Sequence, residues 1–152
     1  MTREMTLAID CGGGGIKGSV VDERGTMMAP ARRVPTPYPL PPELLVETAV
    51  GLAKELPPAT RVTMGMPGMI RHGVVIATPH YITRDGPRSR VLPELVERWD
   101  HFDMGRAIEQ ALSLPTKVLN DAEVAGAGAI TGRGLEMIIT LGTGLGNAVF
   151  DG

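Results

Sequence analysis

The chain has 152 residues, a length that suits one domain with a hydrophobic core of its own. Hydrophobic residues make up 43% and charged residues 21%, which is ordinary globular composition and excludes a disordered chain. The 15 basic residues nearly balance the 17 acidic ones, so no domain-wide positive field is present to hold a nucleic acid. An anionic ligand must therefore be bound by local groups.

Cysteine and histidine usage argues against disulfides and zinc. Cys11 is the single cysteine, so neither an internal disulfide nor a cysteine-pair zinc site can form, and the three histidines lack metal-ligand spacing. The first ten residues lack the apolar core of a signal peptide, and no run approaches the roughly 18 apolar residues of a membrane span. We expect a cytoplasmic protein with no membrane partner.

The first part of the chain predicts a meander of three antiparallel strands, over residues 5–9, 16–21 and 26–34. Four consecutive glycines occupy the first turn. A proline-rich stretch then predicts an extended connector, because proline donates no hydrogen bond to a sheet. Apolar residues at helical spacing predict a helix that begins at Pro42 and ends before Pro57.

The second part alternates strands and helices. Strands are predicted over 62–66, 74–77, 116–119 and 137–141 and from 148 onward, and helices over 94–99, from 103 and over 122–130. Several arginines between residues 84 and 90 indicate an exposed loop, which most often means solvation, although a path for polyphosphate is an alternative.

Two glycine-rich segments share one layout of strand, glycine loop and strand. They are L-A-I-D-C-G-G-G-G-I-K-G-S-V-V and I-I-T-L-G-T-G-L-G-N-A-V-F. Glycine permits backbone conformations in which consecutive N–H groups converge, and such a concavity binds phosphate without net positive charge. The alternative is that both are tight hairpins, where glycine is the usual residue.

Two better-known nucleotide motifs do not apply to the first loop. Gly13, Gly15 and Gly18 match G-x-G-x-x-G by letter, but that dinucleotide motif must open a helix, and a strand is predicted here. A P-loop needs Gly-Lys-Ser/Thr, whereas Lys17 follows Ile16.

Four segments together resemble the ROK sugar kinases, and within them the polyphosphate glucokinases. They are D-C-G-G-G-G-I-K-G, V-T-M-G-M-P-G-M-I, K-V-L-N-D-A-E-V-A-G and I-T-L-G-T-G-L-G-N-A-V, in the family's order and over nearly the whole chain. The resemblance implies a ribonuclease-H-like (actin/hexokinase-type) α/β fold, with a mixed sheet opened by an antiparallel meander and flanked by helices. It also implies that residues 1–152 are the N-terminal domain, with a C-terminal domain outside this chain.

The implied activity is glucokinase-like transfer of a phosphoryl group from ATP or polyphosphate to a hexose, glucose being expected, with Mg²⁺ as cofactor. By the same resemblance Asp121 accepts the proton of the attacking hydroxyl, Asn120 and Gly68 bind the sugar, and Asp10 holds Mg²⁺ through water. The residues assigned to the phosphates are Gly12, Gly13, Gly14, Lys17, Gly142, Thr143 and Gly144. The family usually has Thr or Ser where this chain has Gly14, so one hydroxyl contact is lost.

Each assignment has a structural alternative. Asn120 and Asp121 could cap the helix that follows them, and Asp10 could close its own turn. Lys17 points away from Ile16 on an alternating strand and could be a surface residue.

Two other functions stay open for the whole chain. One is a non-catalytic sugar-binding regulator, disfavoured by the absence of an N-terminal DNA-binding helix pair. The other is a structural fragment that folds, forms a homodimer through an exposed cleft face, and catalyses nothing.

Overall fold

A five-stranded mixed sheet forms the centre of the protein in the computed structural model, which describes residues 4–141 and 145–152. Its strands, in the order β3-β2-β1-β4-β7, are β3 (Arg32–Val34), β2 (Ile16–Asp22), β1 (Met5–Cys11), β4 (Arg61–Met66) and β7 (Thr116–Asn120). The first three strands form an antiparallel meander, and β4 and β7 run parallel to β1. The predicted fold class is confirmed.

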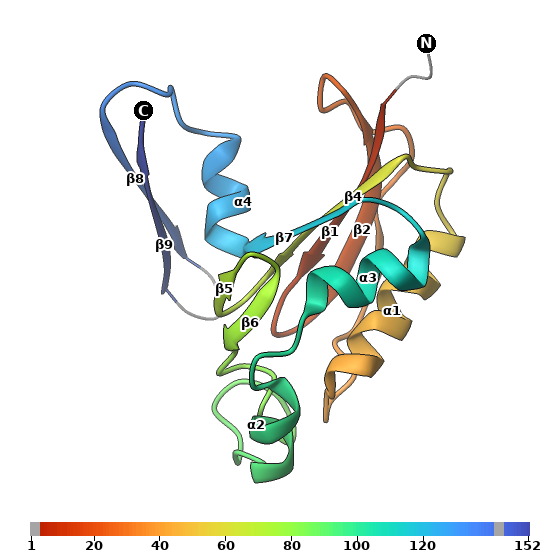
Figure 1. Ribbon diagram of the computed structural model, residues 1–152, viewed down its shortest axis with the longest axis vertical. Coiled ribbons are helices and arrows are strands. Elements are labelled where there is room, and N and C mark those ends of the chain that lie inside the picture. The colour runs from red at the N-terminus through yellow and green to blue at the C-terminus, as the bar shows by residue number, and fades with distance from the viewer. Residues whose placement is uncertain (1–3, 142–144) are drawn as a thin grey trace.

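Helices lie on both faces of this sheet (Figure 1). One face carries α1 (Pro42–Lys54) and α3 (Met104–Leu112), and α1 lies so close that a Cβ on Gly18 would be 3.6 Å from Leu52. The other face carries α4 (Asp121–Ala127), where a Cβ on Gly65 would be 3.2 Å from Val124.

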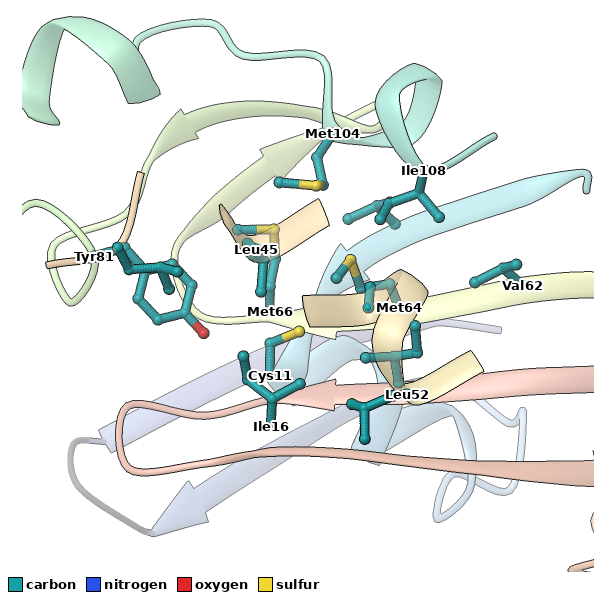
Figure 2. Packing of buried hydrophobic residues seen from close by; sticks show 14 of the residues in the cluster. Cys11, Ile16, Leu45, Leu52, Val62, Met64, Met66, Tyr81, Met104 and Ile108 are labelled. Atoms are coloured by element: carbon teal, nitrogen blue, oxygen red, sulfur yellow. The ribbon is translucent and has the colours of Figure 1, made fainter. Parts of the chain in front are cut away.

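Apolar side chains of the sheet, α1 and α3 form the core, which Figure 2 shows from close by. Met64 and Met66 alternate along β4 and are completely buried, as the alternating pattern predicts. Tyr81 lies at one end of this core, near Cys11 and Met66. The core therefore reaches the carboxyl ends of the strands, where the first glycine loop lies.

A further group of elements packs near the carboxyl ends of the central strands. It contains the hairpin of β5 (Met69–Arg71) and β6 (Val74–Ala77), the segment 78–92, and α2 (Pro93–Trp99). Trp99 donates a 2.9 Å hydrogen bond to the backbone oxygen of Leu40, and its ring centroid lies 5.5 Å from that of Tyr81. These contacts hold the segment against the sheet.

The last hairpin, β8 (Leu135–Leu141) and β9 (Leu145–Asp151), is a separate two-stranded sheet that packs on α4 (Figure 1). The packing is close, since a Cβ on Gly126 would lie 2.5 Å from the ring of Phe150 and 3.1 Å from Ile138. The other face of the hairpin is apolar and exposed. It consists of Leu135, Met137, Ile139, Leu141, Leu145 and Val149.

Several predicted bounds were wrong. The third strand extends over Arg32–Val34 instead of 26–34, with a single bridge between Val21 and Met27 before it, because Pro30 interrupts the ladder. Helix α4 ends at Ala127 instead of 130, next to Gly128, which is a poor helix former. Strand β5 was not predicted. None of the helices in the described part of the chain is long and apolar enough to cross a membrane.

Candidate functional site

A cleft of about 440 Å³ opens between the carboxyl ends of the central strands and the β8–β9 hairpin. Its lining residues are Gly12, Gly13, Pro67, Gly68, Pro79, His80, Asn120, Asp121, Thr140, Leu145, Gly146 and Asn147. The first glycine loop therefore faces the residues on both sides of the second one across a single cavity. Gly142, Thr143 and Gly144 themselves lie outside the described residues.

The first glycine loop is held in place by hydrogen bonds at Gly12, and its next two N–H groups are free of bonds to the described residues. Gly12 donates a 2.9 Å backbone hydrogen bond to Gly15, and its own oxygen accepts hydrogen bonds from Thr36 (2.8 Å) and the Tyr81 hydroxyl (3.4 Å). The N–H groups of Gly13 and Gly14 donate to no acceptor among the described residues. Both donors are thus available to an anion.

Crowding differs from one glycine of this loop to the next. A Cβ on Gly13 would be 2.8 Å from Pro87, and one on Gly15 would be 2.6 Å from the guanidinium of Arg33, which also donates a 3.1 Å hydrogen bond to the oxygen of Gly14. A Cβ on Gly14 would meet no described residue within 4 Å. None of the described residues therefore crowds the position at which the resemblance implies Thr or Ser.

Asp10 and Lys17 form an exposed ion pair next to the loop. They face each other across β1 and β2, with 3.5 Å between Asp10 Oδ2 and Lys17 Nζ, and their side chains are 62% and 55% exposed. Arg33 lies opposite Lys17 on β3. Neither Asp10 nor Lys17 lines the cleft described above, although Asp10 stands only two residues before Gly12, which does.

Strand β7 ends at Asn120, and helix α4 begins at Asp121. The Asn120 side chain accepts a 2.8 Å hydrogen bond from the N–H of Ala122, and Glu123 accepts one of 3.0 Å from the N–H of Asn120. This capping box confirms the helix-cap interpretation for Asn120. Asp121 is the first residue of α4 and lines the cleft. One of its carboxylate oxygens contacts the N–H of Ala122 at 2.9 Å, and the other has no partner among the described residues.

Gly68 occupies a turn that no other residue fits. Its φ is +118°, and a Cβ there would collide with the backbone oxygen of Ala77 and lie 3.0 Å from Cα of Thr78. The Asn120 side chain donates a 2.7 Å hydrogen bond to the Gly68 oxygen. The Pro-Gly turn and the start of α4 are thus joined directly at the cleft wall.

The charges of Asp10 and Asp121 both act on the buried thiol of Cys11. Burial raises the pKa of Cys11 above its usual range, and these two carboxylates raise it further. The pKa of the Tyr81 hydroxyl is also raised, chiefly by burial. Two negative charges therefore lie around the end of β1, although no cluster of three metal-binding side chains is found among the described residues.

His80 is a cleft residue that no sequence motif singles out. It lines the cavity together with Gly68 and Asp121, and its Nδ1 is buried without a hydrogen-bond partner among the described residues. A polar residue just after the apolar strand 74–77 was the available signal. The arginines at 84, 88 and 90 are exposed and do not line the cleft, and Arg84 pairs with Asp85 at 2.8 Å.

Known proteins match this chain over almost its full length. It is 33% identical to an N-acetylmannosamine kinase of Escherichia coli (strain SE11) over 97% of its residues, and it spans 47% of that relative, about half its length. The crystal structure of an inorganic polyphosphate/ATP-glucomannokinase from Arthrobacter sp. strain KM is similar with a TM-score of 0.77 and 32% identity, covering 97% of this chain and 59% of that one.

A second similar structure has ligands bound. A ROK family glucokinase from Streptomyces griseus, in complex with glucose and AMPPNP, gives a TM-score of 0.74 and 30% identity over 97% of this chain and 45% of that one. The sequence model of the ROK family matches residues 6–152. The chain belongs to the ROK family.

Proposed function

We propose that this chain binds a hexose and a phosphoryl donor in its cleft and is the N-terminal part of a glucokinase-like enzyme. The observation that carries the proposal is the meeting of three predicted parts at one cavity. These parts are the open loop at Gly12 and Gly13, the pair Asn120 and Asp121, and the strand ends on either side of residues 142–144. The kinases named above supply the reaction class.

The donor phosphates are assigned to the glycine loops. The N–H groups of Gly13 and Gly14 have no acceptor among the described residues, so a phosphate oxygen would satisfy them. Lys17 next to the loop adds one positive charge. Gly142, Thr143 and Gly144 are assigned to the same phosphates. Phosphoryl transfer depends mostly on positioning and charge neutralisation, which this arrangement provides.

The acceptor sugar is assigned to the opposite wall. Asn120 uses its side-chain oxygen and one N–H within the protein, which leaves its second N–H for a sugar hydroxyl. Asp121 accepts the proton of the attacking hydroxyl on its unpartnered carboxylate oxygen. The hydroxyl oxygen forms a bond to the terminal phosphorus, and the bond between that phosphorus and the bridging oxygen breaks, so that the donor leaves with the electron pair.

Asp10 fits the Mg²⁺ that the family resemblance implies. Its carboxylate is exposed at the margin of the phosphate loop, and Mg²⁺ is usually held by one or two carboxylates, waters and substrate phosphates. When bound, the ion neutralises phosphate charge. Asp10 would hold it through water, with Lys17 next to it.

Glucose with ATP or polyphosphate is the proposed substrate pair. The glucokinase of Streptomyces griseus was crystallised with glucose and AMPPNP, and the Arthrobacter enzyme is named for polyphosphate and ATP.

Calorimetry with glucose, ATP and polyphosphate, combined with a coupled kinase assay, tests the proposal. We expect Asp121→Asn to bind glucose as the wild type does and to lose roughly 10²- to 10⁴-fold in turnover. Asp100→Asn, at an exposed aspartate next to α2, is the matched control. Undiminished turnover in Asp121→Asn would refute its role as the base, and binding of neither sugar nor donor would refute the proposed function.

A further inference from the structure

We infer that His80 is a sugar-binding residue whose Nε2–H donates a hydrogen bond to an oxygen of the acceptor hexose. The inference rests on the proposed function and adds a specificity-determining contact to it. The His80 side chain lies in the cleft wall, and its ring nitrogens bond to none of the described residues.

His80 lines the same cavity as the residues assigned to the sugar, which are Gly68, Asn120 and Asp121. It follows directly on Pro79, which also lines this cavity. The Asn120 amide is bonded to the Gly68 oxygen, so that side of the cavity is held in place. We place the hexose in this cavity with one hydroxyl at Asp121 and another oxygen at the imidazole.

The segment around His80 is fixed at three points. The Thr78 hydroxyl donates a 3.1 Å hydrogen bond to the oxygen of Pro67, the Tyr81 hydroxyl donates one of 3.4 Å to Gly12, and the Thr83 hydroxyl donates one of 2.8 Å to the backbone oxygen of His80 itself. The backbone that carries the imidazole is thus tied to the Pro-Gly turn and to the phosphate loop. Preorganisation of this kind favours a specific contact.

The imidazole has unused hydrogen-bonding capacity. Nδ1 is buried and has no partner, and Nε2 bonds to no described residue. A buried N–H without an acceptor is costly, so the tautomer with the proton on Nε2 is the favoured one. That tautomer presents a donor from the part of the ring that is not buried.

This role differs from catalysis in what it predicts. Asp121 takes the proton in the proposed reaction, so loss of His80 should weaken sugar binding and raise KM while kcat at saturating sugar stays close to wild type. If His80 merely supported the fold, its replacement would instead lower the free energy of unfolding.

Calorimetry and histidine NMR together test the inference. Glucose, mannose and N-acetylmannosamine are titrated into the wild type, His80→Ala, His80→Gln and the control His72→Gln, which changes an exposed histidine in the β5–β6 turn. We expect roughly threefold to tenfold weaker binding for His80→Ala, partial recovery in His80→Gln, which keeps an N–H donor, and no change in His72→Gln. The Nε2 resonance of His80 should shift as sugar is added. This shift should saturate at the same sugar concentration as the heat of binding measured by calorimetry.

The two proposals fail in distinguishable ways. Sugar binding by the wild type, combined with an unmoved His80 resonance or unchanged affinity in His80→Ala, refutes the contact and leaves the kinase proposal standing. Binding of none of the three sugars by the wild type refutes both. A third outcome would identify His80 as a structural residue and would also refute the inference. In that outcome His80→Ala binds sugar more weakly and has a lower free energy of unfolding, while the His80 resonance of the wild type does not shift on sugar addition.

Discussion

The side chain of Asn120 donates a 2.7 Å hydrogen bond from Nδ2 to the backbone oxygen of Gly68, 52 residues away in the chain. The same amide caps α4 through its oxygen. One side chain therefore fixes the Pro-Gly turn, the start of α4 and one wall of the cleft together.

Replacement of Gly68 by alanine should damage both stability and binding. The φ of +118° is strained for any L-residue, typically by about 1–3 kcal/mol, and the new methyl group would collide with Ala77. We expect a loss of stability of at least that size in urea unfolding, together with weaker glucose binding. Gly51→Ala is the control, because Gly51 lies within α1 and a Cβ there would meet no described neighbour within 4 Å outside the helix backbone, so that alanine should stabilise by about 0.5–1 kcal/mol. Equal stability of the two variants would contradict the prediction.

A hydroxyl at position 14 should improve donor binding. A Cβ on Gly14 would lie within 4 Å of no described residue, and the family resemblance implies that a Ser hydroxyl there would add a contact to phosphate. We expect Gly14→Ser to bind ATP or polyphosphate up to about tenfold more tightly by calorimetry. Gly15→Ser, which would collide with the guanidinium of Arg33, should bind more weakly. Weaker donor binding in Gly14→Ser would count against the phosphate assignment of this loop.

Cys11 should be unreactive in the folded protein. Burial raises the pKa of its thiol, and the charges of Asp10 and Asp121 add to the shift. The fold thus favours the neutral thiol, so this contribution to stability is complete below the ordinary thiol pKa of about 8.5 and is lost as pH rises above it. Iodoacetamide labelling at pH 8, read by mass spectrometry, should be undetectable before urea unfolding and complete after it. Labelling of the folded protein at the unfolded rate would show that the thiol is exposed.

Asp10 should determine the Mg²⁺ requirement. We expect Asp10→Asn to need roughly 10- to 100-fold more Mg²⁺ for half-maximal ATP binding, the range seen when a residue that orients a metal ligand is removed. Asp85→Asn, at another exposed aspartate that pairs with a basic neighbour, should behave as wild type. An unchanged Mg²⁺ titration in Asp10→Asn would leave this aspartate only its ion pair with Lys17.

Periodicity predicted most of the fold, because large apolar residues occupy every second position of β4 and α1 repeats apolar residues at helical spacing. It missed β5, whose three residues are too few to show a period. It also placed the end of α4 too late, since its small residues give little indication of where the helix stops.

The candidate site was predictable only in part, because one of its residues lies in a segment without a sequence motif. Gly12, Asn120 and Asp121 belong to recognisable segments, whereas His80 lies in a segment without periodicity, and its place in the cleft depends on tertiary contacts of Thr78 and Tyr81. Side chains held by contacts remote in sequence leave no local pattern.

The close packing of Gly126 against Phe150 affects the width of the cleft. The wall made by Thr140 and Asn147 belongs to the β8–β9 hairpin, and that hairpin packs on α4, whose first residue is Asp121. The absence of a side chain at position 126 thus sets how near the hairpin lies to the first turn of α4. Substitutions on this side of the short helix would therefore change the width of the cleft without altering any residue that lines it.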